Sequence, residues 1–115
     1  MVIIPIDTRQ SSHIMMSVNL GEFTCRFRLL WNERDGYWYC DFQSSNGNND
    51  GVRLVEETPL LGDKNRLGYD GDFRVLKAVK TAEDHISYEN LGKDYSLVFA
   101  TSAEWEEYDG LRTGV

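Results

Sequence analysis

The sequence predicts an all-β fold: a single-domain antiparallel sandwich or partly open small barrel of about six to eight strands, with at most a short C-terminal helix. Several stretches alternate apolar and polar residues with a period of two, which is the pattern of a half-buried strand. Glycine-containing turn signals separate these stretches. Aromatic residues, which are enriched in strands, make up 12% of the chain.

The length of 115 residues suits one domain with its own hydrophobic core. We therefore expect a single β domain over residues 1–115, in which residues 101–115 form an acidic C-terminal tail. Apolar residues are 41% and charged residues 27% of the chain. These values are close to the globular average, so the composition indicates neither a disordered nor a fibrous protein.

The stretch from Glu22 to Gln43 predicts a β-hairpin most clearly. Opposed residues of an antiparallel pair point to the same side, so Trp31 must face an even-numbered residue, and Trp38 fits. This register leaves a four-residue loop that ends in Gly36, which can adopt a left-handed conformation. The same register gives the further pairs Leu29–Cys40, Phe27–Phe42, Arg28–Asp41 and Leu30–Tyr39.

A second hairpin precedes the first. The stretch from Ile14 to Leu20 alternates, and Gly21-Glu22 can close a two-residue turn that places Leu20 opposite Phe23. The two registers agree with each other and predict a three-stranded antiparallel meander over residues 14–43. Residues Val2 to Ile6 read as a short strand, which Pro5 restricts to an edge or a strand start.

The later elements follow from the same signals. Ser44 to Gly51 is polar and glycine-containing and predicts a loop. Three further stretches predict strands, and Asp70-Gly71 predicts a hairpin turn between two of them. Thr81 to Gly92 reads as irregular, and Tyr95 to Ala100 as the last strand. The strand stretches before the last are Val52 to Val55, Leu67 to Tyr69 and Phe73 to Val79.

The segment from Ser102 to Val115 carries four acidic residues around Trp105 and Tyr108. It predicts a short helix from Ala103 to Tyr108 with Ser102 as N-cap. Two alternatives stay open at this point. The segment is a mobile terminus, or it is an aromatic and acidic strap that docks on a neighbouring subunit.

The net charge of −7 and the pI of about 4.7 argue against a nucleic-acid partner, which needs clustered Lys and Arg. A basic protein surface is the partner that this acidity favours. The apolar runs are far shorter than the roughly 20 residues of a membrane span. The N-terminus also lacks the pattern of a signal peptide, so we expect no membrane association.

The two cysteines are predicted to be free and buried. In the hairpin register, Cys25 lies four residues along its strand from the position opposite Cys40. That offset is roughly 13 Å, whereas a disulfide needs Cα atoms within about 7 Å. Two buried thiols suit synthesis in a reducing cytoplasm.

No motif for catalysis, a cofactor or a metal stands out. His13 and His85 fall in different predicted loops, without metal-ligand spacing around them. The acid pairs Asp70 with Asp72 and Glu56 with Glu57 are typical of solvated carboxylates. Residues 46–57 match the spacing of a calcium loop, but Asn46 replaces the usual aspartate and strands flank the segment, so we expect a solvated loop.

The outer face of the predicted hairpin carries an aromatic strip with arginines beside it, which is a candidate contact surface. The alternative is a small carbohydrate-binding β domain that uses the exposed Tyr37 and Tyr39. An enzyme would need a cleft that gathers His13 or His85 with carboxylates. Together with the aromatic residues of the tail, the candidate interface residues are Arg26, Arg28, Leu30, Tyr37, Tyr39, Trp105 and Tyr108.

Several short motifs, taken in order, resemble the phage baseplate plug family of small tail proteins. Their order and spacing carry the resemblance, which covers roughly residues 2–100. Two features depart from the family pattern: a short turn at Leu20-Gly21, and the acidic tail after Thr101. The motifs are Ile4-Pro5-Ile6, Asn32 to Trp38, Gly51 to Val55, Pro59-Leu60-Leu61, Leu67-Gly68, and Leu91-Gly92 followed by Leu97.

The resemblance implies a structural component of a bacteriophage tail, placed in the baseplate near the central hub and without enzymatic activity. The implied partners are other tail proteins, such as hub, tube or spike components, and self-association is a further expectation. The implied location is the virion, after assembly in the host cytoplasm. The family pattern supplies no functional residues to carry over.

Overall fold

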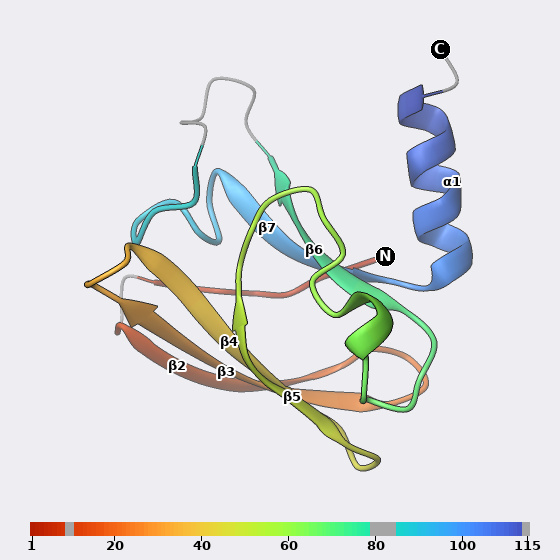
Figure 1. The fold of residues 1–115 in the computed structure, drawn as a ribbon, viewed down its shortest axis with the longest axis horizontal. Helices are drawn as coiled ribbons and strands as arrows, with labels where there is room; N and C mark the ends of the chain where they lie inside the picture. The colour runs from red at the N-terminus through yellow and green to blue at the C-terminus, as the bar shows by residue number, and fades with distance from the viewer. Residues whose placement is uncertain (9–10, 79–84, 114–115) are drawn as a thin grey trace.

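The protein folds into two antiparallel β-sheets that face each other, with one helix outside them (Figure 1). The computed structural model describes residues 1–8, 11–78 and 85–113, and within these ranges it has seven strands. One sheet has the strand order β2-β3-β4-β5 and the other β1-β7-β6. The elements are β1 (Val2–Ile3), β2 (His13–Asn19), β3 (Thr24–Asn32), β4 (Tyr37–Gln43), β5 (Asn48–Arg53), the 3-10 helix η1 (Gly62–Lys64), β6 (Asp72–Lys77), β7 (Tyr95–Ala100) and α1 (Ser102–Thr113). The predicted all-β sandwich is confirmed.

The predicted meander is present with the predicted register. Trp31 lies opposite Trp38, and the loop between them turns at Gly36, whose φ is +73°. The preceding turn places Leu20 against Phe23 through a backbone hydrogen bond of 2.8 Å, with Gly21 at φ +104°. Both glycines adopt the left-handed region that other residues avoid. The turn chemistry therefore fixes which side chains of strands β2, β3 and β4 share a face.

The core lies between the two sheets and is built from aromatic rings. Phe73 of β6 contacts Phe27 and Phe42 of the facing sheet, with ring centroids 5.5 Å and 4.5 Å apart. Phe73 also contacts Phe99 of its own sheet at 5.0 Å. These rings are at most 5% exposed, so the sheets are joined by close-packed apolar surface. Cys25 and Cys40 are buried and free, as predicted.

The predictions for two strands, β5 and β1, were wrong in their bounds. The predicted loop over Ser44 to Gly51 ends early, because β5 already begins at Asn48, where it pairs with Gln43. A bulge follows within the β4–β5 pairing, which lets a polar, glycine-containing edge segment stay in the ladder. The first strand ends at Ile3, although the Ile4 N–H still donates to the Leu97 carbonyl oxygen of β7 at 2.9 Å. The next residue, Pro5, lies where an N–H would point away from β7, so the missing N–H costs the ladder no bond.

The segment from Leu67 to Tyr69 is not a strand, so the hairpin predicted around Asp70-Gly71 is absent from this described part of the chain. Leu67 is buried, but its backbone bonds to side chains: its N–H donates to the Asn65 Oδ1 (2.9 Å) and its carbonyl accepts from the Ser44 hydroxyl (2.6 Å). A loop held by side chains thus replaces a ladder. Strand β6 starts at Asp72 and ends at Lys77, and positions 79–84 lie outside the described residues.

The C-terminal helix is longer than predicted and starts one residue earlier. The structure has α1 over Ser102–Thr113, where the sequence predicted Ala103 to Tyr108. Its cap is Thr101 in place of Ser102: the Thr101 Oγ1 accepts from the Glu104 N–H, and a Glu104 carboxylate oxygen accepts from the Thr101 N–H. This reciprocal capping box stabilises the first turn. Within the described residues, no helix is both long and apolar enough to cross a membrane.

Candidate interaction surface

The outer face of the β2-β3-β4-β5 sheet brings together five of the predicted interface residues. Alternation along β3 and β4 places all five on the side away from the core, where they are exposed or half-buried. Their inward neighbours, such as Phe27 and Trp38, are at most 2% exposed. The sheet thus has one buried and one solvated face. The five outward residues are Arg26, Arg28 and Leu30 of β3 and Tyr37 and Tyr39 of β4.

Arg53 of β5 organises the aromatic half of this face, although it is not among the interface residues that the sequence predicted. Its guanidinium lies 4.6 Å from the Tyr37 ring centroid and 5.9 Å from that of Tyr39. Its Nε donates to the Tyr39 hydroxyl at 3.3 Å, and this contact raises the pKa of Arg53 above its usual value. The Tyr39 hydroxyl in turn donates to the Asp35 carboxylate. The signal that could have found Arg53 is its register opposite Tyr39, which requires knowing that β5 pairs with β4.

The other half of the face is basic. Arg28 donates through Nε to the His13 Nε2 (3.3 Å), and the predicted ion pair with Asp41 is present but long, at 3.9 Å. The side chain of Arg26 makes no hydrogen bond or ion pair with the described residues. Both arginines line a shallow hollow of about 310 Å³ that crosses strands β2, β3 and β4, together with Met15 and Gln43. This half therefore offers arginine donors that the fold leaves accessible.

The guanidinium of Arg53 bears on the carbohydrate-binding alternative. A sugar-binding platform needs an aromatic face open to the ligand, and Arg53 lies over both Tyr37 and Tyr39. The alternative therefore gains no support from this face.

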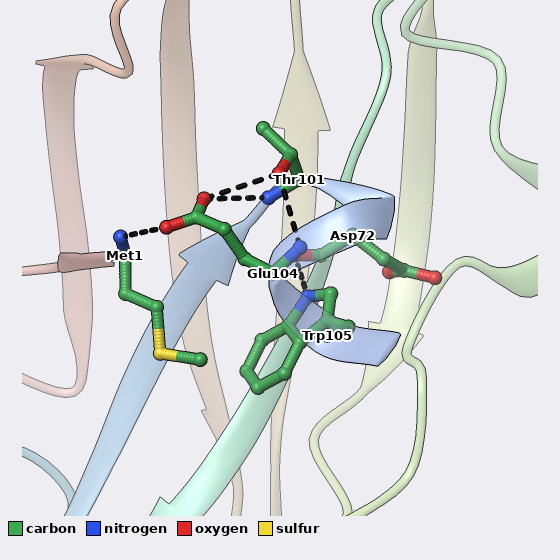
Figure 2. A network of polar contacts seen from close by, with 5 residues as sticks. All are labelled: Met1, Asp72, Thr101, Glu104 and Trp105. Atoms are coloured by element: carbon green, nitrogen blue, oxygen red, sulfur yellow. Dashed lines mark hydrogen bonds and ion pairs between the residues drawn. The ribbon is translucent and has the colours of Figure 1, made fainter. Parts of the chain in front are cut away.

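Trp105 and Tyr108 lie elsewhere, on α1. Trp105 is 4% exposed and packs with Val98 and Ala100 on the outer face of the β1-β7-β6 sheet. Its indole N–H donates to the Asp72 carbonyl oxygen at 2.9 Å, as Figure 2 shows. Tyr108 is half-buried beside it, with ring centroids 5.5 Å apart. We predicted that Trp105 contacts a neighbouring subunit. In the structure it is instead buried against the protein's own sheet.

A buried arginine holds the helix at a second point. Arg74 of β6 is 8% exposed, and its guanidinium lies 4.5 Å from the Trp105 ring centroid. It also donates to both carboxylate oxygens of Asp109, at 2.7 and 3.0 Å, which raises the pKa of Arg74 above its usual value. A bidentate pair of this kind fixes direction as well as distance. The acidic tail is thus a docked helix.

The N-terminus joins the same helix through Glu104 (Figure 2). The amino group of Met1 donates to the Glu104 Oε2 at 2.6 Å, while the other carboxylate oxygen accepts from Thr101. The hydrogen bond from the amino group, followed by the one from Thr101, lowers the pKa of Glu104 below its ordinary value. The first strand and the helix are therefore tied together at one end of the small sheet.

The acid pairs have structural roles. The Asp72 carboxylate accepts from the backbone N–H groups of Leu61 and Gly62, at 3.0 and 2.8 Å. Asp70 accepts from Ser102 at the start of α1. Glu56 accepts from the Tyr95 hydroxyl at 3.2 Å. These contacts hold loops and termini in place, as carboxylates at turns commonly do.

The candidate metal and catalytic residues do not converge. The residues of the calcium-like spacing run into strand β5, and no cluster of three or more metal-ligating side chains occurs in the described residues. His13 starts β2 instead of lying in a loop. His85 lines an open hollow of about 450 Å³ with Trp31, Tyr88 and Glu89. Both His85 and Glu89 are exposed there, so the hollow does not exclude water from them.

Comparison with known families identifies the chain. The family model described as Cyanophage baseplate Pam3 plug gp18 matches residues 1–103. The chain belongs to this phage baseplate plug family. The match covers both sheets and stops inside α1, so most of the helix lies beyond the part that matches the family model. A search of curated proteins finds no match. Membership in the family makes the chain a phage baseplate plug protein and implies a place in the virion tail and contact with other baseplate proteins.

Proposed function

We propose that the protein is a non-enzymatic structural component that acts through protein–protein contacts close to the central hub of the baseplate. Its partners are the neighbouring tail proteins, such as hub, tube or spike components, which it meets in the host cytoplasm during assembly. The proposed contact surface is the outer face of the β2-β3-β4-β5 sheet. Family membership supports the setting, and the residue content of this face supports the mode of action.

The observation that carries the proposal is the concentration of arginine and tyrosine on one face of an acidic chain. The chain has a net charge of −7, yet this face presents Arg26, Arg28 and Arg53 beside two tyrosines. Arginine and tyrosine are among the residues enriched in interface cores and at energetic hot spots. The face therefore fits a partner surface that offers carboxylates and aromatic or aliphatic contacts.

The experiment is co-expression with the other tail proteins of the same genome, followed by affinity capture, together with mass spectrometry of purified virions. We expect the protein in the particles and at least one tail protein in the captured complex. Arg26→Glu is the test variant: the Arg26 side chain is exposed and bonds to no other described side chain, so we expect the charge reversal to keep the fold. We expect it to lower capture about tenfold or more.

Arg66→Glu is the matched control, since Arg66 is an exposed arginine in the loop after η1 and off this face. It changes the net charge by the same amount and should leave capture unchanged. Equal loss with both variants would show a general charge effect and contradict the assigned face. Absence of the protein from virions would contradict the proposed function itself.

A further inference from the structure

The four edges of the two sheets are protected very unequally, and β2 is the one without protection in the described part of the chain. An open strand edge offers unpaired N–H and C=O groups to any other strand, so stable monomers shield their edges. Strand β5 is protected because its pairing with β4 contains a bulge and because it carries the charged residues Asp50 and Arg53. The outer edge of β6 is covered by the preceding loop, in which the Glu57 and Leu60 N–H groups donate to Val75 and Phe73. Strand β1 has only two residues.

Strand β2 carries none of these devices. It has seven residues, HIMMSVN, with no Lys, Arg, Asp, Glu, Pro or Gly. Its pairing with β3 is regular from His13 to Asn19, without a bulge. Met15, in the middle of the strand, is 64% exposed. Charged residues make up 27% of the chain, yet this long and regular edge strand has no Asp, Glu, Lys or Arg. Such an edge is suited to pairing with another strand.

The hydrogen-bond pattern shows which groups face the open side. Backbone bonds from Trp31 to Ser12 (3.0 Å) and from Leu20 to Phe23 (2.8 Å) mark the even-numbered residues as those paired with β3. In an antiparallel ladder the bonded direction alternates, so the N–H and C=O groups of the odd-numbered residues, such as Met15 and Ser17, point to the open side.

The core is also incomplete along this edge. Ile14, Met16 and Val18 point inward from β2 but stay partly exposed. Their partners on β3, the residues Leu29, Phe27 and Cys25, are at most 2% exposed. An added strand would therefore gain both backbone hydrogen bonds and apolar contact.

We propose that β2 pairs antiparallel with β2 of a second copy, across a two-fold axis at Met16, to form a continuous eight-stranded sheet from two β2-β3-β4-β5 sheets. In this register Met15 faces Ser17 of the other copy, so the open N–H and C=O groups of both meet. Ile14 faces Val18 across the axis, which joins the two inner rows of apolar residues. His13 faces Asn19. An isologous contact of this kind is self-complementary and closed.

The absence of charged side chains on β2 lets a second copy occupy this edge. Two chains of net charge −7 repel each other, so their contact must avoid opposed charges. Strand β2 has no Asp, Glu, Lys or Arg, and His13 faces Asn19, so this register opposes no like charges across the new seam. The inference goes beyond the proposed function, because the pairing is tested in the purified chain without other tail proteins.

The first experiment is sedimentation equilibrium of the purified chain over a range of concentrations. We expect a concentration-dependent dimer of the 13.3 kDa chain. Ser17→Pro removes an N–H that points away from β3, so it should keep the intrachain ladder and weaken dimerisation at least tenfold. Ser17→Ala keeps that N–H and should dimerise like the wild type. A monomer at every concentration, or a dimer unaffected by Ser17→Pro in a folded chain, would overturn the proposal.

Two double variants test the same pairing in case Ser17→Pro disturbs folding. The double variant Met15→Lys with Ser17→Lys sets lysines opposite each other and should give monomers. Mixing it with Met15→Glu/Ser17→Glu should restore a heterodimer. A lysine variant that dimerises like the wild type would overturn the pairing. Capture of the β2 edge only by a strand of a different protein would overturn the second copy as occupant.

Cross-linking tests the register. A non-hydrogen-bonded pair on the axis brings the two residues at position 16 within about 4.5 Å between Cα atoms, so Met16→Cys should form an intermolecular disulfide on oxidation. The two residues at position 15 are offset to roughly 8 to 9 Å, beyond disulfide reach. Met15→Cys is therefore the matched control and should stay unlinked. Linkage at position 15 and not at position 16 would overturn this register.

Discussion

Replacing Trp105 by alanine should detach α1 while leaving the main core closed. Trp105 packs with Val98 and Ala100 in a cluster separate from the core between the sheets. The variant loses a side chain that is 4% exposed, an indole hydrogen bond of 2.9 Å and the stacking of Arg74 at 4.5 Å. Buried Trp to Ala changes cost about 3–5 kcal/mol. We expect about 3 kcal/mol, the lower end, because one side of the helix stays in water.

The loss in the protein's free energy of unfolding cannot exceed the free energy that docking of α1 contributes to folding. A loss of about 3 kcal/mol corresponds to a decrease in Tm of roughly 12 °C for a chain of this size. Thermal denaturation followed by circular dichroism measures that decrease, and hydrogen exchange of the peptide covering residues 102–113 measures release of the helix. Leu111→Ala is the control, because Leu111 is 72% exposed on the same helix and should change stability by under about 0.5 kcal/mol. An unchanged Tm with full helix protection in Trp105→Ala would refute the assigned docking contact.

Three further predictions concern charge, backbone conformation and thiols. The carboxylate of Glu104 has a pKa below its ordinary 4.5, so it adds stability above pH 4.5 that is lost as the pH falls through the lowered value; Glu104→Gln should therefore be less stable than wild type at pH 7, and the difference should vanish in acid. Gly92→Ala puts a Cβ 2.2 Å from a carbonyl oxygen at φ +88°, whereas Gly36→Ala, at φ +73°, meets nothing within 4 Å; urea denaturation should give a loss of about 1 kcal/mol for Gly36→Ala and about 3 kcal/mol or more for Gly92→Ala. Burial raises the pKa of Cys25 to about 11 and that of Cys40 above its ordinary value, so both thiols should react with an alkylating agent at pH 8 only after unfolding.

Each of these predictions has an outcome that contradicts it. Glu106→Gln, an exposed change on the same helix, should show no pH-dependent difference from wild type; the same profile in both variants would remove the role of the Glu104 contact. Equal losses for the two glycine variants would mean that crowding at Gly92 is relieved by movement of its neighbours. Rapid alkylation of the folded protein would show that the thiols are accessible in the native state.

The sequence was sufficient where local turn chemistry decides the structure. Gly21 and Gly36 fix two short turns, and the period of two then allows only certain residues to face each other, so the register from Ile14 to Phe42 could be worked out by parity. The same alternation separates the inner face from the outer face. It therefore placed five of the candidate interface residues on one side of the sheet.

Contacts between segments far apart in the sequence could not be predicted from the sequence. Asn48 to Asp50 have the composition of a loop, and they become a strand because β4 supplies a ladder on which they can pair. Arg53 has no local signal for its stacking on Tyr37, since that contact depends on the same pairing. Similarly, the buried partner of Asp109 is Arg74, which lies 35 residues earlier in the chain.

The sequence by itself determined the β-class of the fold, the meander register, the free and buried cysteines and, through its ordered motifs, the baseplate plug family. The tertiary structure alone decided where the C-terminal segment goes and which sheet edge stays open. Trp105 and the acids around it are equally compatible with a free tail, a contact to a neighbour or a docked helix. Only the outer face of β6 and β7, with Arg74 beneath and apolar Val98 and Ala100 alongside, makes docking within the chain the favourable state. The openness of β2 likewise depends on which segments fold over the other edges, and no local pattern in the sequence records that.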